Sequence, residues 1–88
     1  MQFRKESTVM TTTKISINTI NDVKNFVNIV TRCEYDVDII SGRYVIDAKS
    51  IMGIFSIDLT KPVTVSVNGT EEEYKTFREA VKDIIVED

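Results

Sequence analysis

Hydrophobic residues in this chain recur with two different spacings, and the spacing changes repeatedly along the sequence. In 63–67 every second residue is valine, as expected for a β-strand with one buried face. In 23–30 apolar residues fall at i, i+3, i+4 and i+7, which places them on one face of an α-helix. A chain that switches between these two periods has to combine sheet and helix in one fold.

The same patterns, followed along the whole chain, predict elements in the order β-α-β-β-α-β-α. The predicted strands are 11–17, 36–40, 43–47 and 63–67, and the predicted helices run from Thr19 or Asn21 to about 33, from 50 to 56, and from 71 to about 86. This order favours an α+β fold in which helices cover one face of a four-stranded antiparallel sheet.

Turn and cap residues support these boundaries. The second and third strands form a predicted hairpin around Ser41-Gly42, where glycine can take positive φ. Thr70 and Glu73 make a capping box for the last helix. The predicted buried stripe of that helix is Tyr74, Phe77, Ala80, Val81 and Ile84.

The length of 88 residues fits one domain. We expect residues 11–88 to form it and residues 1–10, which are polar and aperiodic, to be a flexible leader. No apolar run has the length of a membrane span or the character of a signal peptide. The single cysteine, Cys33, cannot form an internal disulfide, which fits a reducing compartment. We therefore expect a cytoplasmic protein without membrane insertion.

Charge and residue types exclude several classes of function. The net charge is −3 and the basic residues are scattered, so we expect no direct binding of nucleic acid. The chain has no histidine, so we expect no catalytic site, no metal and no cofactor. Asp36, Asp38 and Asp47 fit a solvated sheet face better than a cation site. Tyr35 and Tyr44 fit structural packing better than base stacking.

The segment Asp47–Ser56 reads Asp-Ala-Lys-Ser-Ile-Met-Gly-Ile-Phe-Ser. It closely resembles the regulatory-serine segment of HPr, the small phosphocarrier of the bacterial sugar phosphotransferase system. Outside this block the resemblance rests on element order, spacing and hydrophobic pattern, from about Ile15 to Ile85. It implies the HPr fold, an open-faced β-sandwich with a four-stranded antiparallel sheet covered on one face by helices.

The chain departs from HPr at the phosphate-carrying site. HPr carries phosphate on a histidine in the loop before its first helix, followed by an arginine and a proline. The matching region here contains Asn18, Thr19, Asn21 and Asp22, and it has no histidine, arginine or proline. Asp22 also puts negative charge where a phosphoryl group needs positive potential. We expect a degenerate phosphoacceptor region. The alternative is a residual phosphocarrier that uses Thr19 or Ser50, which onward transfer of acid-stable phosphate would reveal.

Ser50 occupies the position of the HPr regulatory serine, which a dedicated kinase phosphorylates in many Gram-positive bacteria. A serine that opens a short helix caps free backbone N–H groups. The same groups can receive a phosphate, with Lys49 close by. Two interpretations stay open: Ser50 is a cap only, or it is both a cap and a regulatory phosphosite.

The short helix that follows Ser50 has more apolar side chains than it can turn inward. By the resemblance, Lys49, Ile51, Met52 and Phe55 dock on partner proteins, whereas Ile54 belongs to the core. Gly53 would permit close approach of a partner or of the neighbouring backbone. The alternative interpretation is that these side chains cover the end of the sheet.

Together these features predict a non-enzymatic HPr-like protein that binds other proteins and is switched by phosphorylation at Ser50. The expected partners are the serine kinase, a phosphotransferase-system component or a transcriptional regulator. A small-ligand-sensing regulatory module of the ACT type is an alternative, because similar element orders occur there. A thermal-shift screen with metabolites would separate the two, since a ligand that binds only the native state raises its stability.

Overall fold

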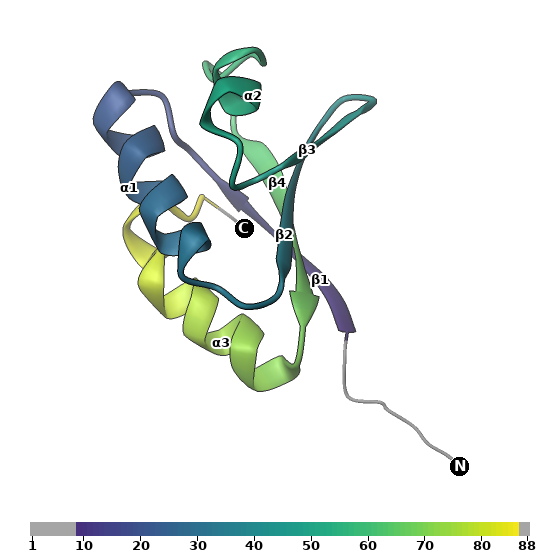
Figure 1. Ribbon diagram of the computed structural model, residues 1–88. Helices are drawn as coiled ribbons and strands as arrows, with labels where there is room; N and C mark the ends of the chain where they lie inside the picture. The colour runs from purple at the N-terminus through teal and green to yellow at the C-terminus, as the bar shows by residue number, and fades with distance from the viewer. Residues whose placement is uncertain (1–8, 87–88) are drawn as a thin grey trace.

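The computed structural model describes residues 9–86, and their elements follow the predicted order (Figure 1). The strands are β1 (Val9–Ile15), β2 (Asp36–Ser41), β3 (Tyr44–Asp47) and β4 (Val63–Gly69). The helices are α1 (Ile20–Thr31), α2 (Ile51–Phe55) and α3 (Glu71–Ala80), followed by the 3₁₀ turn η1 (Lys82–Ile84). Over residues 9–86, no helix has the length and apolar character of a membrane span.

The four strands form one sheet in the order β1-β4-β2-β3, and every neighbouring pair is antiparallel. α1 and α3 lie together on one face of this sheet, whereas α2 lies at its end, near β3 (Figure 1). The predicted α+β fold, with a four-stranded antiparallel sheet and helices on one side, is confirmed.

The alternation along β4 decides which face of the sheet is buried. Its three valines are at most 4% exposed, whereas Thr64 and Asn68 point to the other face and are more accessible. In the register of the sheet, Val65 stands between Thr13 of β1 and Ile39 of β2, and all three are buried. A one-residue slip would turn this whole row toward solvent, so the valine pattern specifies the register.

Two phenylalanines join the helices over this face. Phe26 of α1 and Phe77 of α3 are at most 1% exposed, and their rings meet edge to face with centroids 6.3 Å apart. Val23 and Val30, one turn to either side of Phe26, are also fully buried. The predicted apolar face of α1 therefore packs on the sheet as expected.

The first strand begins earlier than the sequence pattern suggested. β1 starts at Val9 rather than Thr11, because the ladder with β4 continues to the pair Val9–Gly69. Val9 and Met10, which were expected in the leader, are therefore part of β1, and the rest of that predicted leader lies outside the described residues. At its other end the strand stops at Ile15, although Ile17 is still buried.

The last helix is shorter than predicted. α3 ends at Ala80, and the chain passes through η1 to Ile85, which pairs in antiparallel fashion with Ile15 of β1. Ala80 is consequently exposed, whereas Val81 is buried. If the helix continued, the residues after Ala80 could not make their hydrogen bonds to the edge of β1. The backbone groups of that edge would then lack protein partners, which lowers stability.

The hairpin turn lies one residue later than expected. Its two turn residues are Gly42 and Arg43, flanked by the pair Ser41–Tyr44. Gly42 has φ of 62°, a left-handed conformation that glycine adopts without steric cost.

Candidate functional site

Ser50 opens α2 in the way the sequence predicted. Its backbone is extended, its Oγ accepts a hydrogen bond from the Gly53 N–H at 3.2 Å, and its carbonyl oxygen accepts one from the Ile54 N–H at 3.0 Å. The N–H of Ser50 donates to the carbonyl oxygen of Asp47 at 2.9 Å. This cap orients an exposed hydroxyl at the start of a helix of five residues.

The apolar side chains of α2 divide between core and surface. Ile54 is fully buried and Ile51 is half-buried, whereas Met52 is 77% and Phe55 is 44% exposed. Met52 and Phe55 are three residues apart and so share one side of the helix. The expectation that Ile54 is the core member is confirmed, and the most exposed apolar residues are two of the predicted docking residues.

Gly53 allows α2 to lie directly against β3. A Cβ at this position would stand 2.8 Å from Cγ2 of Ile46 and 3.0 Å from Oγ of Ser50. Both distances are shorter than ordinary contacts, so a larger residue would push α2 away from the strand. The close neighbour is thus the side chain of Ile46 rather than the strand backbone, and approach of a partner at this glycine stays a prediction.

Lys49 is exposed, and its side chain reaches the residue that follows the C-cap of α1. Its Nζ donates to the carbonyl oxygen of Cys33 at 3.2 Å, and its backbone N–H donates to Oδ1 of Asp47 at 2.9 Å. A cation just beyond the C-terminal end of α1 also faces the negative end of the helix dipole. Lys49 thus fixes the connection between β3 and α2.

The residues that the sequence analysis expected at a degenerate phosphoacceptor loop form a helix start. Oγ1 of Thr19 accepts a hydrogen bond from the Asp22 N–H at 3.0 Å, so Thr19 is the N-cap, and Asn21 is not. Asn18 and Asn21 are exposed, and Asp22 is half-buried in the first turn. Ile20, the first residue of α1, is 66% exposed.

α1 and α2 are in contact, and the start of α1 lies at the same end of the molecule as α2 (Figure 1). We use the name α1–α2 surface for three exposed apolar side chains, Ile20 at the start of α1 and Met52 and Phe55 on α2. Met52 and Phe55 were expected here from the resemblance to HPr. Ile20 was missed because one apolar residue at a helix start carries no periodic signal.

Carboxylates gather on the sheet face that carries no helix. Asp38 and Asp47 stand directly opposite each other in the β2–β3 ladder, and Asp36 is two residues along β2. Burial, followed by the charges of Asp47 and Asp36, raises the pKa of Asp38. Within residues 9–86 no group of three metal-ligating side chains is placed to hold an ion.

Tyr35 packs between α3 and the end of β4. Its hydroxyl donates to the carbonyl oxygen of Glu73 at 3.4 Å, and its ring lies close to Gly69. Burial is the main reason why the pKa of Tyr35 is raised, with the nearby Cys33 adding to it. Cys33 is a free thiol that donates to the carbonyl oxygen of Ile29 at 3.5 Å. Both residues act in packing.

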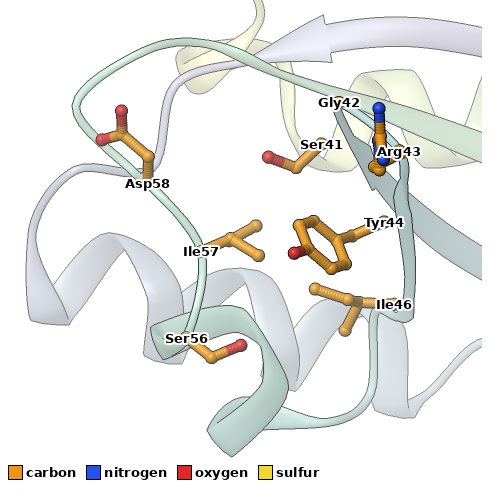
Figure 2. A pocket seen from close by; sticks show the side chains of 8 residues that line it. All are labelled: Ser41, Gly42, Arg43, Tyr44, Ile46, Ser56, Ile57 and Asp58. Atoms are coloured by element: carbon orange, nitrogen blue, oxygen red, sulfur yellow. The ribbon is translucent and has the colours of Figure 1, made fainter.

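A cleft of about 780 Å³ lies between the β2–β3 hairpin and the segment after α2. Figure 2 shows Tyr44 and Ile46 pointing from β3 toward Ser56 and Ile57 on the opposite wall. The remaining lining residues are Ser41, Gly42, Arg43 and Asp58. The sequence offered no signal for this cleft, because its two walls are brought together only by the packing of α2 on β3.

No protein-family model matches the chain, and a search of the curated proteins finds no match.

Proposed function

We propose that this chain is a non-enzymatic, HPr-like protein-binding module of the cytoplasm. It docks on partner proteins through the α1–α2 surface, and phosphorylation of Ser50 switches that contact. The observation that carries the proposal is the placement of Met52 and Phe55, both exposed, immediately after an exposed, capping Ser50. The proposed partners are an HPr-type serine kinase, a phosphotransferase-system component or a transcriptional regulator.

Burial supports a docking role for this surface. Met52 leaves 77% of its area in water although the same helix buries Ile54 completely. Methionine is flexible and polarisable, which suits an adaptable protein contact. Phe55, one turn after Met52 on the same helix, is 44% exposed and enlarges the apolar area that a partner would cover.

Local geometry supports the switch. The Ser50 hydroxyl already accepts a backbone N–H at the helix start, so a phosphate attached there finds a donor in place. It would add a charge of about −1.5 to −2 within one helical turn of Met52. A partner that covers the apolar side chains would then meet or avoid that charge, and its affinity would change.

The absence of histidine and the capping role of Thr19 argue against phosphate relay. Thr19 uses its hydroxyl oxygen to hold the first turn of α1, and Asp22 brings negative charge to the same turn. Incoming phosphate would meet an occupied cap and a carboxylate there.

The first experiment tests the switch. The protein is incubated with an HPr-type serine kinase and ATP, and its intact mass is measured. We expect the gain of one phosphate in the wild type and in Ser56→Ala, and no gain in Ser50→Ala. An unlabelled wild type would remove the switch from the proposal.

The second experiment tests docking. Partners are captured from the native cytoplasm with the wild type, Met52→Asp and the control Asn28→Asp, which adds the same charge at an exposed position of α1. We expect Met52→Asp to lose partners that the control retains. Identical profiles for all three proteins would mean that α2 is not the interaction surface.

A further inference from the structure

The two edge strands of the sheet are treated differently by the rest of the chain. β1 and β3 are the outer strands, and the outer edge of β1 is covered. The bonds that cover it are Tyr74 hydroxyl to Thr12 carbonyl at 2.9 Å, Val86 N–H to Lys14 carbonyl at 2.9 Å, and Ser16 N–H to Ile84 carbonyl at 2.8 Å. The C-terminal segment and α3 therefore close this side against further strand pairing.

The outer edge of β3 is open. Ser41 and Tyr44 flank the two-residue turn and so form a hydrogen-bonded pair, which directs the N–H and C=O of the next residue, Val45, away from β2. Within residues 9–86 no backbone hydrogen bond reaches these two groups. The side chains of Tyr44 and Val45 are 65% and 67% exposed. β3 thus presents unpaired backbone flanked by apolar side chains.

The sequence of β3 is complementary to itself in one register. When two copies of β3 pair antiparallel with Val45 opposite Val45, each Tyr44 stands opposite Ile46 of the other copy. Arg43, the turn residue directly before β3, then comes opposite Asp47 of the other copy. Shifting one strand by two residues in either direction also keeps the N–H and C=O of Val45 hydrogen-bonded between the strands. One of these shifts places Arg43 opposite Lys49, and the other places it opposite Val45. Only the first register pairs opposite charges.

Neither the Arg43 nor the Asp47 side chain is paired with an opposite charge among the described residues, and Asp47 accepts a hydrogen bond from the backbone N–H of Lys49. Arg43 makes no hydrogen bond or ion pair with any described residue. Asp47 stands opposite Asp38 in the same chain, and like charges directly opposite each other destabilise a sheet. A guanidinium from a second copy beside Asp47 would offset this repulsion.

The cleft beside β3 provides room for the apolar half of the same contact. Tyr44 and Ile46 point into it, and its volume is about 780 Å³ (Figure 2). In the self-complementary register, Tyr44 and Ile46 of the second copy face the same side of the joined sheet. Their side chains extend the apolar lining of the cleft.

We propose that β3 pairs antiparallel with β3 of a second copy, with Val45 at the two-fold axis, and that the two sheets become one. This inference stands on the open edge and the Arg43–Asp47 complementarity, and it does not depend on Ser50 or on the α1–α2 surface. The contact is short, so we expect a dimer that forms reversibly at high protein concentration.

Sedimentation equilibrium of the full chain over a wide range of concentrations tests the proposal. We expect a monomer–dimer equilibrium for the wild type and for the control Lys14→Glu, an exposed charge reversal on β1. In a dimer of the Arg43→Glu variant, each glutamate faces Asp47 of the other copy. In a dimer of the Asp47→Lys variant, each lysine faces Arg43 of the other copy, so both variants have two pairs of like charges. Each variant should dimerise about tenfold more weakly or worse.

Mixing the two variants provides the decisive comparison. A mixture of Arg43→Glu with Asp47→Lys restores opposite charges at both pairs, so it should form a heterodimer of wild-type strength. Hydrogen exchange of the wild-type Val45 amide should slow as concentration rises. Three results would each overturn the proposal: a wild type that stays monomeric, single variants that dimerise as tightly as the wild type, or a mixture that dimerises no better than the single variants. A monomeric wild type would mean that the open edge of β3 binds an extended segment of another protein instead.

Discussion

At the residue scale, Gly53 shows how tightly α2 approaches β3. Alanine would bring a Cβ to 2.8 Å from the Ile46 side chain, which is held close to the strand backbone and cannot easily move aside. Overpacking costs about 1–3 kcal/mol, whereas alanine gains about 1 kcal/mol in helix propensity. We expect Gly53→Ala to lower the free energy of unfolding by about 1–2 kcal/mol in urea denaturation. Adding Ile46→Ala should recover part of that loss, and an unchanged loss would show that the contact is not its cause.

Asp38 carries a second prediction at this scale. Burial raises its pKa, and Asp47 and Asp36 add to the effect, so ionising Asp38 costs more in the folded state than in the unfolded state. The folded state is penalised as the pH rises through this raised pKa, and the penalty is absent below the ordinary pKa of about 3.9. We expect Asp38→Asn to raise the free energy of unfolding near neutral pH and to change it little at about pH 3.

Asp58 supplies a control of opposite sign. Hydrogen bonds from the hydroxyl and then the N–H of Thr60 lower its pKa, so its carboxylate stabilises the folded state above the ordinary pKa and loses that effect as the pH falls through the lowered value. Asp58→Asn should therefore reduce stability near neutral pH. Equal effects of the two substitutions would contradict the assignment of their environments.

At the scale of elements, α1 depends on its cap. Oγ1 of Thr19 satisfies the Asp22 N–H, one of the donors that a helix start leaves without a partner. We expect Thr19→Ala to lower the free energy of unfolding by about 0.5–2 kcal/mol, and Thr19→Ser to cost less because it keeps the acceptor. Chemical denaturation of the three proteins measures this. Equal losses for serine and alanine would mean that the hydrogen bond contributes nothing.

α2 is an element that only its surroundings hold in place. A helix of five residues is far below the length at which isolated helices are stable in water. The burial of Ile54 and the Ser50 cap keep it on the sheet, which leaves Met52 and Phe55 free for a partner.

At the scale of the whole molecule, the C-terminal segment completes the sheet. Removing residues 82–88 would delete the Ser16–Ile84 and Val86–Lys14 hydrogen bonds and open the outer edge of β1. Each bond contributes about 0.5–1.5 kcal/mol, so we expect the free energy of unfolding to fall by about 1–3 kcal/mol. Thermal denaturation and light scattering should show lower stability and self-association through the new edge. Removing residues 87–88 alone, which keeps both bonds, is the matched control.

Features that depend on neighbours in sequence were predicted well. The capping box of Thr70 and Glu73 forms as expected, and so does the Ser50 cap, because each requires residues three positions apart. The burial of Ile54 was expected from the resemblance to HPr, and the shortness of the helix indicated only that some of its apolar residues stay exposed. The element order was confirmed as well, since periodicity is a local property.

Features that depend on distant contacts were missed or misplaced. The periodic stripe of α3 continued past Ala80, but pairing with β1 drew the chain out of the helix. The hydrogen bond from Nζ of Lys49 to the carbonyl oxygen of Cys33 was likewise not predicted. Neither partner is near in sequence, so no local pattern could indicate the contact.

The sequence by itself therefore determined the type and order of the elements, their caps and the buried side of each strand, because these follow from backbone preferences and spacing within a few residues. Tertiary structure alone decided the strand order, the closing of the β1 edge, the open β3 edge and the cleft beside it. Each of these depends on hydrogen bonds and packing between segments far apart in the chain, whose energies exist only once the fold has brought them together.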